Sequence, residues 1–493
     1  MMVRNVNVTY RNQRSMALPG FMPNIGDMFG QRTGGVMAPG LGFAFGLTGD
    51  EYIDKAQRNG WLLGYNPEDS TAVRNTSAAT TSATEDLQIR ATLEPVRDLK
   101  IDLNASRTTN QTRSIQFMYE GSPTTYGGTF TMTTISIGSA LEGMGDANNG
   151  YQSNTFDRFC ASIEGYRDRV QAQYPSGERA QSNSQPSTLN SQPSTLNPVD
   201  PYSADVLIPA FLNTYTLSGG SSLNIFPALS RILPNWTFKY SGLAKLPWIQ
   251  DHFKSVNINH SYKSVYAVGS YASYSSWVAF NGDLGYIQAA DGSYTPSSRY
   301  NISTVSITES FSPLLGLDVT FNNNLTAKVE YKTTRGLNLS MTSVQINEAL
   351  SKDWVIGLGY KITDFNLFGS GSNREAKGNK KGKKGNNDQQ DAQKTQKTQK
   401  TQKGQVNHDL NMRVDFSLRK QAAITRDIRT GVSSASSGNS ALKISLRADY
   451  TLSRYLTLTA YYDRQTNTPL LSSSSYPTTT HDFGFSMRFS LTR

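Results

Sequence analysis

The chain has 493 residues, of which only 37% are apolar and 17% are charged, yet it contains 25 Tyr and 21 Phe. The apolar share is too low for a set of ordinary soluble domains, and the aromatic residues are too many for a disordered chain. Residues 374–404 hold ten basic and three acidic residues, which is 7 of the net charge of +10. Most of the net charge therefore lies in one segment, and the rest of the chain is not generally basic.

The membrane-related signals in the sequence indicate strands and not helices. No run of 18 apolar residues exists, so no transmembrane helix is expected. A composition rich in Tyr, Thr and Ser is typical of strands with one face toward lipid and the other toward water. The residues after Met1 include no apolar signal segment, so we expect a fragment whose true start lies upstream. Cys160 is the only cysteine, which excludes internal disulfides.

Residues 1–140 are expected to contribute barrel strands and one irregular insertion. Apolar and polar residues alternate over Leu87–Leu93 and over Leu99–Ala105, as they do in strands with one apolar face. The segment near 18–62 is rich in Gly, Pro and Met, and we expect it to be a plug-like insertion. Within it, Asp50 is expected to cap a short helix.

Residues 141–230 lack this alternation and are expected to form a non-barrel insertion. Apolar residues recur with helical spacing, which predicts a helix near 155–174 that Asn154 or Thr155 caps. A tandem heptapeptide repeat predicts an extended linker over 180–200. In a barrel, an insertion of this size either folds inward as a plug or stands outside as a cap.

Residues 231–493 carry the strongest strand signal. Over 442–452 the even positions are apolar or aromatic and the odd positions are polar or charged. Residues 325–332 and 410–419 alternate in the same way, and residues 483–491 set Phe and Met against Gly, Ser and Arg. Because side chains alternate across a strand, each segment has one apolar face and one polar face.

Soluble β-sandwiches share this alternation, but three features favour a membrane barrel. The segments are nine to twelve residues long, close to the ~9–11 residues that cross a bilayer at a tilt. Their polar faces mix acidic and basic residues, as a water-filled lumen tolerates. Trp236, Tyr331, Trp354 and Tyr455 are expected near strand ends, where an aromatic girdle lies. The predicted fold is therefore all-β, an antiparallel transmembrane β-barrel of about 14–18 strands, with irregular plug or cap insertions that carry one or two short helices.

The lengths of the predicted connections indicate a topology. Tight turns are predicted at Lys420-Gln421 and at Ser453-Arg454, and long connections at 464–481 and at 367–405. Bacterial barrels have short periplasmic turns and long external loops. This alternation places the C-terminus in the periplasm and the Lys-rich loop 367–405 outside the cell. No aromatic residue is interleaved with the lysines over 378–404, so no nucleic-acid partner is expected.

The sequence holds no constellation that indicates catalysis or a metal or cofactor site. The four His are not paired at metal-ligand spacing, and motifs for a nucleophile elbow or a phosphate-binding loop are missing. We expect neither enzyme activity nor a cofactor. The polar strand faces are instead the expected lining of an aqueous pore. The candidate pore-lining residues are Lys328, Glu330, Arg413, Asp415, Lys443, Arg447, Asp449 and Arg488.

Several short motifs follow one another in a fixed order along the chain. They include Leu18-Pro-Gly-Phe21, Gly49-Asp-Glu-Tyr-Ile53, Ile208-Pro-Ala-Phe211, Leu233-Pro-Asn-Trp236 and Val355-Ile-Gly-Leu-Gly-Tyr360. With these motifs the chain resembles the C-terminal portion of the SprA (Sov) family, the outer-membrane translocon of the type IX secretion system and of gliding motility in Bacteroidota.

The resemblance implies part of a very large barrel whose pore passes folded proteins to the cell surface. The implied partners are outer-membrane lipid, secreted cargo proteins with a C-terminal signal domain, and the shuttle and plug proteins of the secretion system. Two other functions remain open. One is a complete porin-like or plugged channel for small solutes, and the other is a surface adhesin built of soluble sandwiches.

Overall fold

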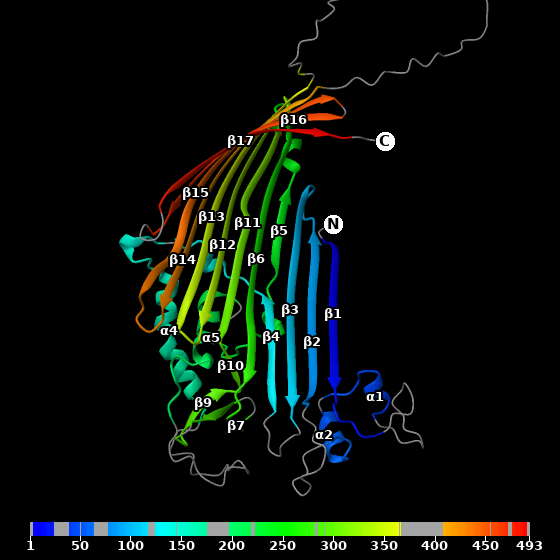
Figure 1. Cartoon of the computed structure of the whole chain (residues 1–493), viewed down its shortest axis with the longest axis vertical. Helices are drawn as coiled ribbons and strands as arrows, with labels where there is room; N and C mark the ends of the chain where they lie inside the picture. The colour runs from blue at the N-terminus through cyan, green and yellow to red at the C-terminus, as the bar shows by residue number, and fades with distance from the viewer. Residues whose placement is uncertain are drawn as a thin grey trace, which may run out of the picture.

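The computed structural model of the chain describes residues 3–23, 39–49, 51–63, 77–116, 124–143, 145–174, 197–217, 222–281, 284–289, 291–363, 365, 408–453, 455–471 and 476–490. Its main element is one curved antiparallel sheet of 14 strands (Figure 1). The predicted fold class, an antiparallel β-barrel wall with short helices in its insertions, is confirmed.

Twelve long strands follow one another across the sheet. They are β1 (Val3–Ala17), β2 (Ala79–Leu93), β3 (Leu99–Ile115), β4 (Thr125–Thr133), β6 (Phe253–Ser273), β11 (Thr304–Phe321), β12 (Leu325–Ser340), β13 (Gln345–Ile362), β14 (Leu410–Asp427), β15 (Ser433–Ser453), β16 (Leu456–Pro469) and β17 (Thr478–Phe489). Among the described residues β1 and β17 each have one neighbouring strand, so the sheet is an open wall.

The remaining elements lie beside this wall. β5 (Asn235–Tyr240) pairs with β3 and β6, and β10 (Tyr300–Ile302) pairs with β6. A separate three-stranded sheet consists of β7 (Trp277–Asn281), β8 (Leu284–Gln288) and β9 (Tyr294–Ser298). The helices are α1 (Leu41–Ala44), α2 (Glu51–Arg58), α3 (Ile137–Ala140), α4 (Asn154–Gln171), α5 (Ala204–Tyr215) and α6 (Pro247–Gln250). None of the described helices is both long and apolar enough to cross a membrane.

The strand register divides the wall into two faces, because directly paired residues of neighbouring strands point to the same side. We call face A the side that holds Tyr331 and its partner Trp354, and face B the side that holds Glu330 and its partner Val355. The partners of these residues on the other strands assign every position of the wall to one of the two faces.

Toward the edge of the wall at which β1 begins and β17 ends, which we call the upper edge, face A is an apolar band. The band runs across the whole sheet and includes Val6, Val8, Leu87, Ile89, Ile101, Leu103, Trp236, Phe238, Ile258, Leu317, Val319, Val329, Ile356, Leu358, Met412, Val414, Phe416, Ile444, Leu446, Leu458, Phe483, Phe485 and Met487. On β14 and β15 it spans about nine residues, or roughly 30 Å of strand, which is enough to cross a bilayer core at a tilt. Leu358 and Leu446 in the band are more than 40% exposed, whereas Trp236 packs against the cluster of Ala140, Tyr262 and Phe311.

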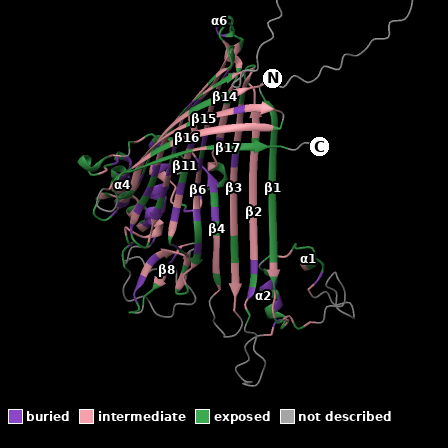
Figure 2. Cartoon of the chain, turned by 45° about the horizontal axis from the view of Figure 1, so that its top comes forward, coloured by how far each residue is buried: buried purple, intermediate pink, exposed green. Residues whose placement is uncertain are grey.

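The lower half of face A is covered by the helical insertion. Phe159 of α4 and Phe211 of α5 are fully buried in one cluster with Tyr266, Ile307 and Leu337 of the wall. Figure 2 shows these buried segments near α4, below the exposed upper part of the strands. The insertion and the apolar band therefore lie on the same side of the wall.

α4 lies where the sequence predicts a helix, but its cap differs. Ser153 and not Asn154 or Thr155 is the N-cap, because its hydroxyl accepts a hydrogen bond from the Phe156 amide at 3.2 Å. α5 was not predicted, since Pro209 lies inside it and proline usually ends a helix. Its almost uniformly buried residues have no polar stripe that would reveal the helical period.

The described part of the insertion near 18–62 also lies on face A. Met16 at the end of β1 packs against a cluster that contains Tyr52, Ile53 and Ala56 of α2. Both insertions therefore lie on the face opposite the predicted pore lining. The plug-like role of residues 18–62 stays a prediction. Asp50 lies outside the described residues.

The predicted topology is wrong in one respect. β14 runs unbroken from Leu410 to Asp427 through the predicted tight turn at Lys420-Gln421. Without that turn, Ile362, Leu410 and Tyr450 lie at one edge of the sheet, which β17 also reaches at its C-terminal end. The described residues next to segment 367–405 and those at the end of β17 therefore lie at the same edge, at the top of Figure 1, so the predicted alternation of turns does not separate them. The sides of the membrane assigned to the C-terminus and to the Lys-rich loop 367–405 stay predictions. Residues 367–405 and most of 180–200 lie outside the described residues.

Candidate functional site: the charged face of the wall

The candidate pore-lining residues all lie on face B. The register pairs Lys328 with Gly357 and Gly357 with Asp415, which faces Ser445 on the next strand. The same chain of partners places the other candidates on this face. They are Glu330, Arg413, Lys443, Arg447, Asp449 and Arg488. None of them lies on face A, so one side of the wall holds the whole predicted set.

Neighbouring charges on face B neutralise one another along single strands. Glu330 accepts from Lys328 at 2.9 Å and from Lys332 at 3.0 Å, and its side chain is only 11% exposed. Arg413 contacts Asp415 at 2.7 Å. These residues are two apart, so their side chains point to the same side of the strand. Face B is therefore polar and highly charged, with its charges balanced locally.

Further ion pairs on face B connect neighbouring strands. Arg419 contacts Asp353 at 2.9 Å, and Lys443 contacts Asp463 at 3.2 Å. Asp353 and Asp463 were not among the predicted residues. The sequence shows alternation within a strand but not the register between strands, and the register alone reveals these partners. Among the described residues Arg488 has no ion pair.

A buried ion cluster fixes the helical insertion to face A. Glu348 accepts from Arg335 at 2.6 Å and from Arg426 at 2.7 Å, and all three side chains are less than 5% exposed. The two guanidinium groups also donate to backbone oxygens of the insertion, Arg335 to Ser139 at 2.7 Å and Arg426 to Tyr151 at 2.6 Å. Each buried charge thus has a partner, and the cluster joins three strands to the insertion.

Two titratable groups in the insertion have shifted pKa values. Burial raises the pKa of Glu142, but hydrogen bonds from Thr155 and Ser153 outweigh this effect, so the net pKa is lowered. Burial raises the pKa of Cys160 to about 11, which keeps the thiol protonated at neutral pH and makes it a poor nucleophile.

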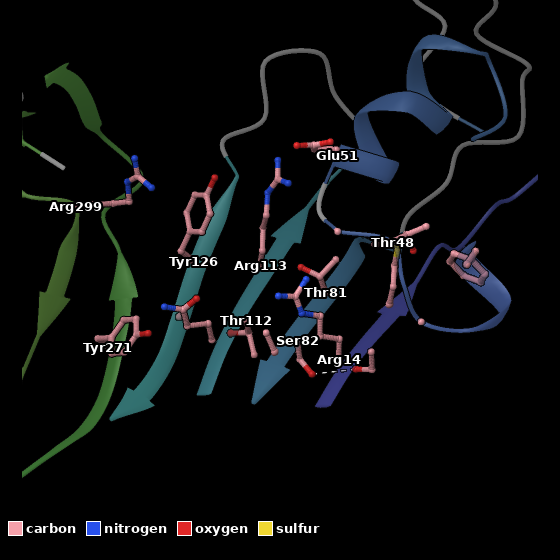
Figure 3. Close-up of a pocket in the computed structure, with 18 of the residues that line it drawn as sticks. Arg14, Thr48, Glu51, Thr81, Ser82, Thr112, Arg113, Tyr126, Tyr271 and Arg299 are labelled. Carbon is pink, nitrogen blue, oxygen red and sulfur yellow. Dashed lines mark hydrogen bonds between the residues drawn. The ribbon is translucent and has the colours of Figure 1, made fainter. Parts of the chain in front are cut away.

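A cavity of about 780 Å³ lies on the lower part of face A, between the insertion near 18–62 and the residues Tyr271, Arg299 and Tyr300. Figure 3 shows Arg113, Tyr126 and Arg299 side by side along its wall. The Tyr126 ring centroid lies 5.0 Å from the Arg299 guanidinium carbon and 5.9 Å from that of Arg113. Arg14 of β1 also lines the cavity. No sequence pattern indicated this cavity, because its residues come from strands that alternate only weakly there.

Gly128 allows Tyr271 to form part of the cavity wall. A Cβ atom at this position would lie 2.6 Å from the Tyr271 hydroxyl and 2.0 Å from the carbonyl oxygen of Asn110. Both distances are far below van der Waals contact, so only glycine fits without a shift of the backbone. In the part of the chain that the structure describes, no three His, Cys, Asp or Glu side chains are grouped as metal ligands.

Comparisons with known proteins add little to this picture. No family model matches the chain, and no curated protein matches it. Structures that align with it include the beta domain of the Bordetella autotransporter Brka, with 7% identity over 84% of this chain and 92% of that chain and a TM-score of 0.20. Another is OmpT, an outer membrane protein of Vibrio cholerae, with 9% identity over 83% and 92% and a TM-score of 0.20. An anion-selective porin from Comamonas acidovorans has 9% identity over 79% and 82% and a TM-score of 0.10. Scores this low carry no argument.

The geometry itself identifies the class of protein. An antiparallel wall with an exposed apolar band on one face and a charged, hydrated face on the other is the organisation of an outer-membrane β-barrel. In that organisation face A meets lipid along the band, and face B meets water.

Proposed function

We propose that this chain forms part of the wall of a protein-export channel in the bacterial outer membrane, of the type IX kind that its sequence motifs resemble. The observation that carries the proposal is the opposition of the two faces: an unbroken apolar band on face A behind the locally balanced charges of face B. Balanced charges leave no strong field that would hold a passing polypeptide or favour ions of one sign. Face B is therefore suited to passive transit.

The open edges of the wall favour a wide channel. Within a membrane every backbone amide and carbonyl needs a partner, so β1 and β17 require neighbouring strands in the working channel. Twelve long strands that do not close on one another support a barrel larger than an ordinary porin, in which 16–18 strands leave a channel for small solutes.

The connections at the upper edge support an orientation. Leu93 is followed closely by Leu99, and Phe321 by Leu325, and short turns of this kind are typical of the periplasmic side. The upper edge then faces the periplasm, as proposed for the C-terminus, and the Lys-rich segment 367–405 starts and ends on that side. Both insertions lie at the opposite, extracellular side, where they are available to cargo, shuttle and plug proteins.

A crosslinking experiment tests the proposal in cells that carry the full protein. A photoreactive amino acid replaces Arg447 on face B or its neighbour Leu446 on face A, and irradiation follows during secretion. We expect adducts with secreted proteins from position 447 and adducts with lipid alone from position 446. Protein adducts from neither position, together with small ion-selective conductance steps in planar bilayers, would refute export and support the small-solute channel.

A further inference from the structure

The cavity on the lower part of face A combines cationic side chains from three separate parts of the chain. Arg14 comes from β1 and Arg113 from β3, and Arg299 lies between β9 and β10. Arg113 lies 3.8 Å from Asp54, which partly neutralises it. Among the described residues Arg14 and Arg299 form no ion pair, and Glu51 is the one carboxylate that lines the cavity with them. The described lining therefore carries three guanidinium groups against one carboxylate.

The Arg299 guanidinium is held in place by aromatic rings on two sides. Its central carbon lies 4.7 Å from the ring centroid of Trp277 and 5.0 Å from that of Tyr126. Stacking of this kind restrains the planar group but leaves its edge free to donate. A guanidinium edge presents two parallel N–H groups, which match two oxygens of a phosphate. The hydroxyls of Thr81 and Tyr271 add neutral donors to the same cavity.

The position of the cavity relative to the apolar band indicates the source of such a phosphate. Tyr10 marks the lower end of the band on β1, and Arg14 follows four residues later on the same face, or roughly 13 Å along the strand. At the ordinary tilt of barrel strands this corresponds to about 10 Å of depth, just past the end of the hydrocarbon core. The polar headgroup region extends about 5–7.5 Å beyond the hydrocarbon core on each side, so Arg14 lies at its outer margin.

We propose that this cavity binds the phosphorylated headgroup of an outer-membrane glycolipid. Arg299 and Arg14, which line different parts of the cavity, each bind a phosphate group of this headgroup, and the apolar lining residues Met16 and Phe43 contact the lipid beside it. The volume of about 780 Å³ suits a disaccharide-sized headgroup. The lipid source rests on the proposed function, because it requires face A to meet the membrane, whereas the preference for phosphate rests on the cavity alone.

Binding of lipid A to the full protein, extracted from outer membranes into detergent micelles, tests the inference. We expect Arg14→Gln and Arg299→Gln each to weaken binding about tenfold, because each removes a charge-assisted hydrogen bond. Arg11→Gln is the matched control: it makes the same change in charge three residues away on β1, but on face B. Retention of the heat-modifiable electrophoretic shift in every variant shows that the wall has folded.

Two competitors identify the recognised chemistry. Dephosphorylated lipid A should fail to bind, and inorganic phosphate should compete only weakly. Equal binding of dephosphorylated lipid A, or equal effects of Arg11→Gln and Arg14→Gln, would overturn the phosphate site. Inorganic phosphate that binds as tightly as lipid A would overturn the lipid source. If no secreted protein crosslinks to position 447 while lipid A still binds, the proposed function is refuted and the phosphate site is not.

Discussion

The rings of Tyr331 and Trp354 stack across β12 and β13 with their centroids 4.6 Å apart, at the level where face A changes from apolar to polar. Above this pair, Val329 faces Ile356, and below it Thr333 faces Lys352. Stacked amphipathic rings at such a change mark the interface between hydrocarbon and water. The pair therefore fixes the lower boundary of the membrane on these two strands.

A reversal of polarity on neighbouring residues of β15 should distinguish the two faces. Leu446→Arg places a charge in the middle of the apolar band, which costs about 2–4 kcal/mol at the centre of a bilayer. Arg447→Leu removes an exposed charge from face B, where water can solvate the groups that this charge contacted. We expect the first variant to lose the heat-modifiable barrel form in outer membranes and the second to keep it. Equal tolerance of both changes would contradict the assignment of the faces.

Removal of the central carboxylate of the buried ion cluster should release the insertion from the wall. Glu348→Gln leaves the guanidinium groups of Arg335 and Arg426 buried without a counter-charge, and breaking a buried pair in this way costs about 3–5 kcal/mol. We expect faster protease cleavage within α4 and α5 while the wall remains folded. Asp449→Asn, which removes an exposed carboxylate on face B, should leave the cleavage rate unchanged, and equal rates in both variants would refute the role of the cluster.

The start of α4 should become less stable in acid. Glu142 accepts hydrogen bonds from the Ser153 hydroxyl at 3.0 Å and from the Thr155 amide at 3.3 Å, and its pKa is lowered overall. A carboxyl group with a lowered pKa stabilises the fold above its ordinary value of 4.5, and this stability is lost as the pH falls through the lower folded value. Hydrogen-exchange protection of the Thr155 and Phe156 amides should fall over that range. The fall should be absent in Glu142→Gln, and an unchanged acid response in that variant would exclude Glu142 as the cause.

Substitution by alanine should affect the stability of the wall differently at two of its glycines. At Gly128 the added methyl group meets the Asn110 carbonyl oxygen at 2.0 Å, whereas at Gly336 no atom lies within 4 Å. Overpacking of this kind costs about 1–3 kcal/mol, so Gly128→Ala should lower the thermal unfolding temperature and Gly336→Ala should not. A stable Gly128→Ala protein would show that β3 and β4 are not as close as the structure has them.

The sequence predicted the faces of the wall better than the ends of its strands. Leu442 to Tyr450 alternate strictly because one side meets lipid, and the structure has these residues on face A as expected. Below Ser440 both sides of β15 are polar, so the alternation that reveals a strand disappears although the strand continues to Ser433. The same loss of contrast at Lys420 suggested a turn within β14, which the continuous strand contradicts. The predicted sides of the C-terminus and of the Lys-rich loop depended on that turn.

The contacts that lie beyond the reach of the sequence are those between distant segments. Arg335 and Glu348 lie diagonally on the two strands of one hairpin, since Arg335 faces Leu350 and Glu348 faces Leu337. Their burial depends on Ser139, which lies 196 residues away in sequence from Arg335. The cavity residue Arg299 is likewise defined by Tyr126 and Trp277, which share no local pattern with it. Alternation is a local property, whereas these sites arise from the register and from packing between elements.

Nitroxide scanning along β15 measures most directly which solvent each face meets. In a Cys160→Ser background, single labels are placed in turn at the positions from Ser440 to Tyr450, and their collisions with oxygen and with a water-soluble nickel complex are compared in reconstituted membranes. We predict oxygen preference at positions 442, 444, 446 and 448 and nickel preference at 443, 445, 447 and 449. If the labels at the even-numbered positions collide with neither reagent, as side chains packed under a second sheet would, face A does not meet lipid.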